Sequence, residues 1–285
     1  MNDEDREDDE ADDLDEESSE EDIEPSEEEE LTAEEEAQLE EERLRKERAY
    51  FRVTRGFWAG LLFALPLLAV YEAGALVFGA DVNAVAAKVK MPISWLQRHP
   101  TEIFGVDLML IVNSVMIAVV LVAIWRVGRL GALREGAFLG MFAESCVYAL
   151  LLGPLALAPL TGEFQFAGFS PHLKDFGEKL VISAGAGFYE EGFFRLVLLG
   201  AIFYFAKEWG ELHSFTAGAL ALVVSGALFS AAHFFSPGAT ADLGAFIYRL
   251  AAGMILGLIF LTRGIGIAAW THAMYDVYVL CFTAQ

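Results

Sequence analysis

Apolar segments long enough to cross a lipid bilayer constrain this chain more than any other feature of its sequence. A helical crossing needs about 20 mostly apolar residues. Windows of this kind cover residues 57–78, 106–125, 137–160, 180–206, 215–235, 244–261 and 264–282. Because only helices and closed barrels satisfy the backbone inside lipid, we predict an all-α, polytopic transmembrane bundle of about seven spans, with six to eight as the range.

The first 50 residues differ in composition from the rest of the chain. They hold 27 of the 42 acidic residues and only 5 of the 19 basic residues. Acidic runs such as Asp8–Glu10 and Glu27–Glu30 leave too little apolar surface to offset the entropy of ordering. We therefore expect a disordered acidic tail over residues 1–50 and a membrane domain over residues 51–285. A short helix at about residues 32–48 remains an alternative within the tail, because its acidic residues precede its basic ones.

Basic residues gather beside two of the predicted spans. They are Arg43, Arg45, Lys46, Arg48, Arg52 and Arg55 before the first span, and Arg126, Arg129 and Arg134 after the second. The positive-inside rule then places the N-terminus and the loop after the second span in the cytoplasm. Compact loops and the absence of a transit-type N-terminus favour a bacterial inner membrane as the location.

Several classes of function find no support in the sequence. It contains no Gly-rich phosphate loop and no dinucleotide fingerprint, and the acidic tail would repel nucleic acid. Both cysteines, Cys146 and Cys281, fall inside predicted spans. We expect them to be packing residues rather than members of a disulfide or metal framework.

Titratable side chains interrupt three of the predicted spans. Such groups cost on the order of 2.5 to 3.5 kcal/mol each at bilayer depth, so they persist where they pair, face water or carry out chemistry. The candidate site residues are Glu190, Glu191 and Arg195 in the fourth span, His233 in the fifth, and His272 and Asp276 in the seventh. Acids and imidazoles from three helices predict a shared active site.

Helical spacing divides the roles of the two glutamates. Glu191 and Arg195 are four residues apart and share a helix face, so we expect a structural ion pair. Glu190 points about 100° away from its neighbour and is left free as a general base. In the seventh span, Asp276 follows His272 by one turn and can hold its ring in one tautomer. This set of groups suits either the activation of a water molecule or the binding of a metal ion.

Three ordered motifs carry a resemblance to a known family. Glu190-Glu191-x-x-x-Arg195, Phe229-x-x-x-His233 and His272-x-x-x-Asp276 resemble the signature motifs of the CAAX prenyl protease and bacteriocin-processing (CPBP) family of intramembrane proteases, also called the Abi family. The resemblance covers about residues 180–282. It implies an endopeptidase that reaches a peptide or protein substrate in the membrane. Asn is frequent in the family where this chain has Asp276.

The family implies two designs for catalysis. In the glutamate design, Glu190 and His233 activate a water molecule, while His272 and Asp276 stabilise the oxyanion. In the zinc design, Glu190, His233 and His272 bind a metal ion that lowers the pKa of the water. We favour the glutamate design without a cofactor, because Glu190 has no partner along its helix and Asp276 has one in His272.

Two other functions use the same residues. A transporter could employ them as a proton relay, although the sequence shows neither broken helices nor inverted repeats. A catalytically silent scaffold or immunity protein could retain the fold. The intact motif residues favour the protease over both alternatives.

Overall fold

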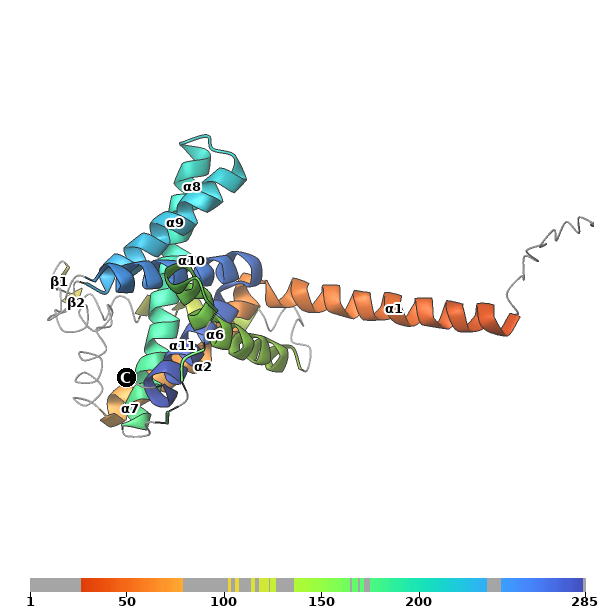
Figure 1. The fold of residues 1–285 in the computed structure, drawn as a ribbon, viewed down its shortest axis with the longest axis horizontal. Helices are drawn as coiled ribbons and strands as arrows, with labels where there is room; N and C mark the ends of the chain where they lie inside the picture. The colour runs from red at the N-terminus through yellow and green to blue at the C-terminus, as the bar shows by residue number, and fades with distance from the viewer. Residues whose placement is uncertain are drawn as a thin grey trace, which may run out of the picture. The chain divides into compact units, whose positions relative to one another are not determined.

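The computed structural model describes residues 27–78, 136–164, 166–168, 170–171, 175–234 and 242–283, and short pieces between residues 102 and 126. Its regular elements are helices, apart from an antiparallel pair of two-residue strands, β1 (Glu102–Ile103) and β2 (Val106–Asp107) (Figure 1). Five helices of the described part are apolar and long enough to cross a membrane. The predicted all-α membrane bundle is confirmed. The span expected at 106–125 lies largely outside the described residues.

The five helices agree with the predicted windows to within a few residues. They are α2 (Phe57–Phe78), α6 (Ala137–Thr161), α9 (Ser214–Ala232), α10 (Leu243–Arg263) and α11 (Ile265–Phe282). Helix α10 begins just after its N-cap residue Asp242, whose carboxylate accepts hydrogen bonds from the backbone N–H groups of Gly244 and Ala245. It ends at Gly264, where φ is 91°, a value that glycine adopts without strain.

The predicted span at 180–206 is a helix of mixed type. It consists of α7 (Phe176–Gly185), two π-helical segments, η1 (Ala186–Glu190) and η2 (Gly192–Leu199), and α8 (Gly200–Glu208). The assumption of regular α-helical spacing around Glu190 and Glu191 was therefore wrong. Glycines at 187 and 192 weaken the α-helical preference here, and π-helical segments are frequent at functional sites. Helix α8 then runs beside α9 as a hairpin (Figure 1).

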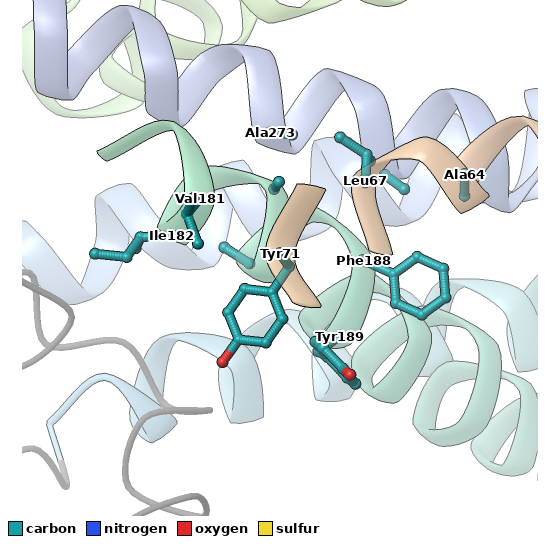
Figure 2. Packing of buried hydrophobic residues seen from close by; sticks show 11 residues of the cluster. Ala64, Leu67, Tyr71, Val181, Ile182, Phe188, Tyr189 and Ala273 are labelled. Atoms are coloured by element: carbon teal, nitrogen blue, oxygen red, sulfur yellow. The ribbon is translucent and has the colours of Figure 1, made fainter. Parts of the chain in front are cut away.

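Helix α11 lies at the centre of the helical packing and contacts α2, α6, α7, α10 and η1. One buried cluster joins α2, α7, η1 and α11, and includes Leu67, Tyr71, Val181, Phe188 and Ala273 (Figure 2). The helices approach closely because small residues line their contacts. A Cβ atom added to Gly253 in α10 would lie 3.1 Å from the Cα of Gly226 in α9. Gly253 therefore allows α10 to approach the backbone of α9 at this point.

Helix α1 (Glu27–Thr54) covers part of the segment expected to be disordered. It is longer at both ends than the predicted helix at 32–48, and an exposed ion pair of 2.8 Å joins Glu42 to Lys46 one turn later. The predicted disorder of residues 1–26 lies outside the described residues. The chain divides into two compact units, residues 1–47 and 48–285, so the end of α1 belongs to the same unit as the bundle.

A buried polar cluster ties the end of α1 to the bundle. Arg263, the last residue of α10, forms an ion pair through Nε with Glu144 of α6 and donates from Nη2 to Glu144 Oε2 (2.7 Å) and Thr54 Oγ1 (3.1 Å). Glu144 also accepts hydrogen bonds from the hydroxyls of Tyr50 (3.1 Å) and Tyr148 (2.8 Å). We call these five residues the Glu144 cluster. They explain how α6 tolerates an acid inside a membrane-length helix.

Candidate active site

Glu191 lies at the junction of the two π-helical segments and holds two cationic or polar partners. Its Oε1 atom is 2.8 Å from Arg195 Nη1 and 2.7 Å from His272 Nδ1. Glu191 is completely buried, and Arg195 is only 1% exposed. The pairing of Glu191 with Arg195 follows the predicted spacing. The bond to His272 was not predicted, and it brings the first and third motifs into direct contact.

The bond to Glu191 determines how His272 is protonated. An ionised carboxylate only accepts hydrogen bonds, so Nδ1 of His272 carries the hydrogen. The other ring nitrogen, Nε2, faces Asp276 Oδ2 at 3.7 Å, beyond normal hydrogen-bond length. Two carboxylates therefore flank the ring. Nε2 can donate to a third group only when the ring is doubly protonated.

Glu190 is the one acid of the set without a partner. It is only 3% exposed, and its Oε1 atom has no hydrogen-bond partner in the described part of the chain. It lies close enough to His272, Asp276 and Glu191 for their charges to interact. A buried carboxylate oxygen without a partner is costly. Such an oxygen is available to a bound water molecule or a substrate proton, as the sequence predicted for this residue.

The phenylalanine of the second motif connects the remaining groups. The ring of Phe229 lies 4.8 Å from the ring of His233, 5.8 Å from that of His272 and 4.4 Å from the guanidinium carbon of Arg195. Arg195 Nη2 also donates to the carbonyl of Gly253 in α10 (3.3 Å). The aromatic ring thus holds an imidazole from α9 beside the ion pair of η2.

His233 differs from the other site residues in its position. Its Nδ1 atom is 2.9 Å from the carbonyl oxygen of Phe229, which can only accept, so Nδ1 carries the hydrogen and Nε2 is an acceptor in the neutral ring. The residue is partly exposed, where Glu190 and His272 are buried. No hydrogen bond joins His233 to Glu190 among the residues that the structure describes. A direct link between these two motif residues is therefore absent from this arrangement.

Close backbone packing fixes η1 against α11. A Cβ atom added to Gly187 would lie 2.4 Å from the carbonyl oxygen of Ala269 and 2.7 Å from the Cβ of Ala273. Only glycine allows this contact, one turn before His272 along α11. Glu190 follows Gly187 by three residues, so the same contact sets its depth relative to His272.

One acid near the site, Glu72, does not belong to any of the three sequence motifs. Glu72 of α2 accepts a hydrogen bond of 2.6 Å from the hydroxyl of Tyr189, the residue before Glu190. The ring of Tyr189 packs against Tyr71 at 5.4 Å, and Figure 2 shows both tyrosines on adjoining elements. A lone acid in an apolar span indicated that Glu72 needs a hydrogen-bond partner, but the sequence did not identify Tyr189 as that partner.

The zinc design needs Glu190, His233 and His272 to converge on one ion. Within the described segments, no three His, Cys, Asp or Glu side chains are grouped so that they could hold a metal ion. Nδ1 of His272 is bonded to Glu191, whereas Nε2 lies 3.7 Å from Asp276 Oδ2 and is the ring nitrogen left to meet a substrate or a metal ion. The choice between the glutamate design and the zinc design therefore stays a prediction, and no step below depends on a metal.

Comparison with known proteins gives one match. Residues 174–278 match the family model described as type II CAAX prenyl endopeptidase Rce1-like. The matched region contains every candidate site residue, and the match confirms the resemblance that the three motifs indicated. No curated protein and no solved structure shows significant similarity to the chain.

Proposed function

Because residues 174–278 match the Rce1-like family of type II CAAX prenyl endopeptidases, we propose that the chain is a membrane-embedded endopeptidase of the glutamate type. The family match and the five apolar helices support a protease that lies in a membrane and meets a protein substrate there. The match also favours this function over a proton-relay transporter or a silent scaffold. The finer assignment rests on one observation, the unpartnered and buried carboxylate of Glu190.

In this mechanism Glu190 is the general base. A water molecule between Glu190 and His233 would donate one hydrogen to the glutamate and the other to Nε2 of His233, which is an acceptor in the neutral ring. The water oxygen attacks the peptide carbonyl carbon as Glu190 takes its proton. Glu190 then returns the proton to the leaving amine, and the peptide bond breaks.

His272 is the proposed electrophile for the oxyanion. To donate from Nε2 it must be doubly protonated, and the carboxylates of Glu191 and Asp276 provide the surroundings that such a cation needs. A donor that is already oriented stabilises the developing negative charge without reorganisation. Glu191 and Arg195 act through His272 and Phe229, which they hold in place.

The orientation of the protein in the membrane is also proposed. The guanidinium carbon of Arg126 lies 5.9 Å from the ring of Trp58, which follows the basic residue Arg55 by three positions, so Arg126 lies near the N-terminal end of α2. This supports a cytoplasmic location for that end and for the N-terminus.

The replacement Glu190→Gln tests the mechanism. It preserves shape and removes the base, so the peptidase rate of purified protein should fall by at least ~100-fold, the usual contribution of a positioned acid or base. Glu208→Gln changes an exposed acid at the end of α8 and should have no effect. A Glu190→Gln enzyme with near-parental activity would refute the assignment.

Metal removal separates the two designs. We expect the protein to remain active after exhaustive chelation, with a bell-shaped pH profile set by Glu190 and a coupled histidine. Elemental analysis and the rate should be measured on the same sample. About one zinc ion per chain, whose removal stops turnover and whose return restores it, would establish the zinc design instead.

A further inference from the structure

Three arginines form a stripe along the last turns of α1 and the turn that follows it. They are Arg48, Arg52 and Arg55, all of them exposed, and we call them the arginine stripe. Successive members are four and three residues apart, so their side chains share one face of the helix. Arg55 continues this face beyond the end of α1, because its N–H donates to the carbonyl of Phe51 (3.1 Å).

The opposite face of the same turns is held by the bundle. Tyr50 and Thr54 each lie two residues from a member of the stripe, which is about 200° around the helix. Tyr50 donates to Glu144 (3.1 Å), and Thr54, which is completely buried, accepts from Arg263 (3.1 Å). These contacts fix the rotation of α1 about its axis. The arginine stripe therefore lies on the face that points away from the Glu144 cluster.

The charges of the stripe have no counter-charge within the protein. In the part of the chain that the structure describes, no carboxylate lies within ion-pair distance of its three guanidinium groups. By contrast, Lys46 on the preceding turn of α1 is paired with Glu42 at 2.8 Å. The buried arginines Arg195 and Arg263 are also paired with carboxylates. The stripe is thus available to an anion from outside the described chain.

The stripe lies where the chain enters the membrane-length helix α2. Phe57, the first residue of α2, is 41% exposed. The ring of the next residue, Trp58, lies 5.9 Å from the guanidinium carbon of Arg126, which is also exposed. Tryptophan rings at the end of a span lie at the level of the lipid headgroups. Lipid phosphates lie at the same level, and their oxygens accept the planar pair of donors that a guanidinium presents.

We propose that the arginine stripe binds the phosphates of anionic lipids, so that the end of α1 is held by the bundle on one face and by lipid headgroups on the other. Each basic residue beside a span raises the affinity for an anionic lipid surface by about fivefold. Phosphatidylcholine has a phosphate but no net charge, so it should bind much more weakly. The site needs no peptide and does not depend on the proposed peptidase activity.

The test measures lipid binding to the full-length protein in detergent after its lipids have been removed. Phosphatidylglycerol or phosphatidylcholine is added in steps, and native mass spectrometry gives the bound fraction of each lipid. We expect the parent protein to bind phosphatidylglycerol ~100-fold more tightly than phosphatidylcholine, which is three contributions of about fivefold. The combined variant Arg48→Gln, Arg52→Gln, Arg55→Gln should bind the two lipids equally. Arg52→Gln alone should lose about fivefold, and it tests the site if the combined variant does not fold.

A control variant removes the same charge from exposed positions outside the stripe. It combines Arg43→Gln, Lys46→Gln and Lys207→Gln, and it should bind phosphatidylglycerol like the parent protein. Melting temperatures are measured on the same samples. Phosphatidylglycerol should raise the melting temperature of the parent and of the control variant, because it binds the native state, but not that of the combined stripe variant. In phosphatidylcholine the three proteins should melt alike.

Four results would overturn the proposal. A parent protein that binds the two lipids equally has no site for anionic lipid. Equal losses in the stripe and control variants would assign the preference to diffuse charge. Inorganic phosphate that displaces phosphatidylglycerol at equal concentration would assign the stripe to free phosphate. Binding of phosphatidylglycerol that appears only after removal of residues 1–26 would make the acidic segment the occupant of the stripe.

Discussion

Glu191 has two charged or polar partners, whereas its helical spacing predicted only Arg195. One oxygen atom, Oε1, lies close to both Arg195 and His272. Removing either charged partner of a buried pair leaves the other uncompensated, which costs about 3 to 5 kcal/mol. Arg195 also lies over the ring of Phe229. Its loss would loosen the second motif together with the first.

For Arg195→Ala we predict a lower melting temperature and lower expression as well as lower activity, because Glu191 would remain charged and buried. Thermal unfolding in detergent measures the effect, and Lys207→Ala in the exposed part of α8 is the matched control. If Arg195→Ala melts like the parent protein and loses only turnover, then Arg195 belongs to the catalytic machinery.

Glu191→Gln separates the two partners of Glu191. The amide can still accept a hydrogen bond from His272, but it gives Arg195 no negative charge. We expect a smaller loss of thermal stability than in Arg195→Ala, because Arg195 loses its compensating charge but keeps the carbonyl of Gly253 and the ring of Phe229 as partners. The pH dependence of the rate should change, since one of the two charges beside His272 is gone. An unchanged pH profile would argue against any influence of Glu191 on His272.

At the scale of elements, the π-helical segments carry Glu190 and flank Glu191, and α11 packs against both segments. The sequence located the spans well because about 20 apolar residues leave few alternatives in lipid. It also identified the pair Glu191–Arg195, since residues four apart share a face of an α-helix and still meet in this π-helical segment. It could not predict the bond from Glu191 to His272 or the cluster around Glu144. Those contacts join residues 81 and 119 positions apart, and their register depends on helix packing.

Two neighbouring glycines offer a matched test of this packing. Gly187→Ala would place a methyl group 2.4 Å from a backbone oxygen of α11 and force η1 away, so we expect losses of both stability and activity. Gly192→Ala meets nothing within 4 Å and should be neutral or stabilising by about 0.5–1 kcal/mol. The melting temperature and the peptidase rate of both variants are measured and compared with those of the parent protein. Equal behaviour of the two variants would contradict the proposed contact between η1 and α11.

At the scale of the whole molecule, the acidic segment and the membrane bundle are separate compact units. The boundary between them falls inside helix α1. The boundary lies after Glu47. The residues of α1 beyond it include Tyr50 and Thr54, which bind Glu144 and Arg263. Composition alone places the boundary near residue 50 but does not reveal that these last residues of the helix have buried partners.

Truncation should therefore have a sharp limit. Removal of residues 1–47 should leave melting temperature and peptidase activity in detergent unchanged, because no residue of the Glu144 cluster is lost. Removal of residues 1–56 should lower both, since Glu144 and Arg263 would each lose hydrogen-bond partners. A shorter truncation that folds but is inactive would show that the acidic segment takes part in catalysis.

The contact between α2 and α11 limits the routes by which a polypeptide can enter. A Cβ atom on Gly266 would lie 2.3 Å from the carbonyl oxygen of Gly60, so these two backbones touch without intervening side chains. No change of rotamer can widen such a contact. A lateral route for the proposed substrate between these two helices would therefore require their backbones to separate at this point.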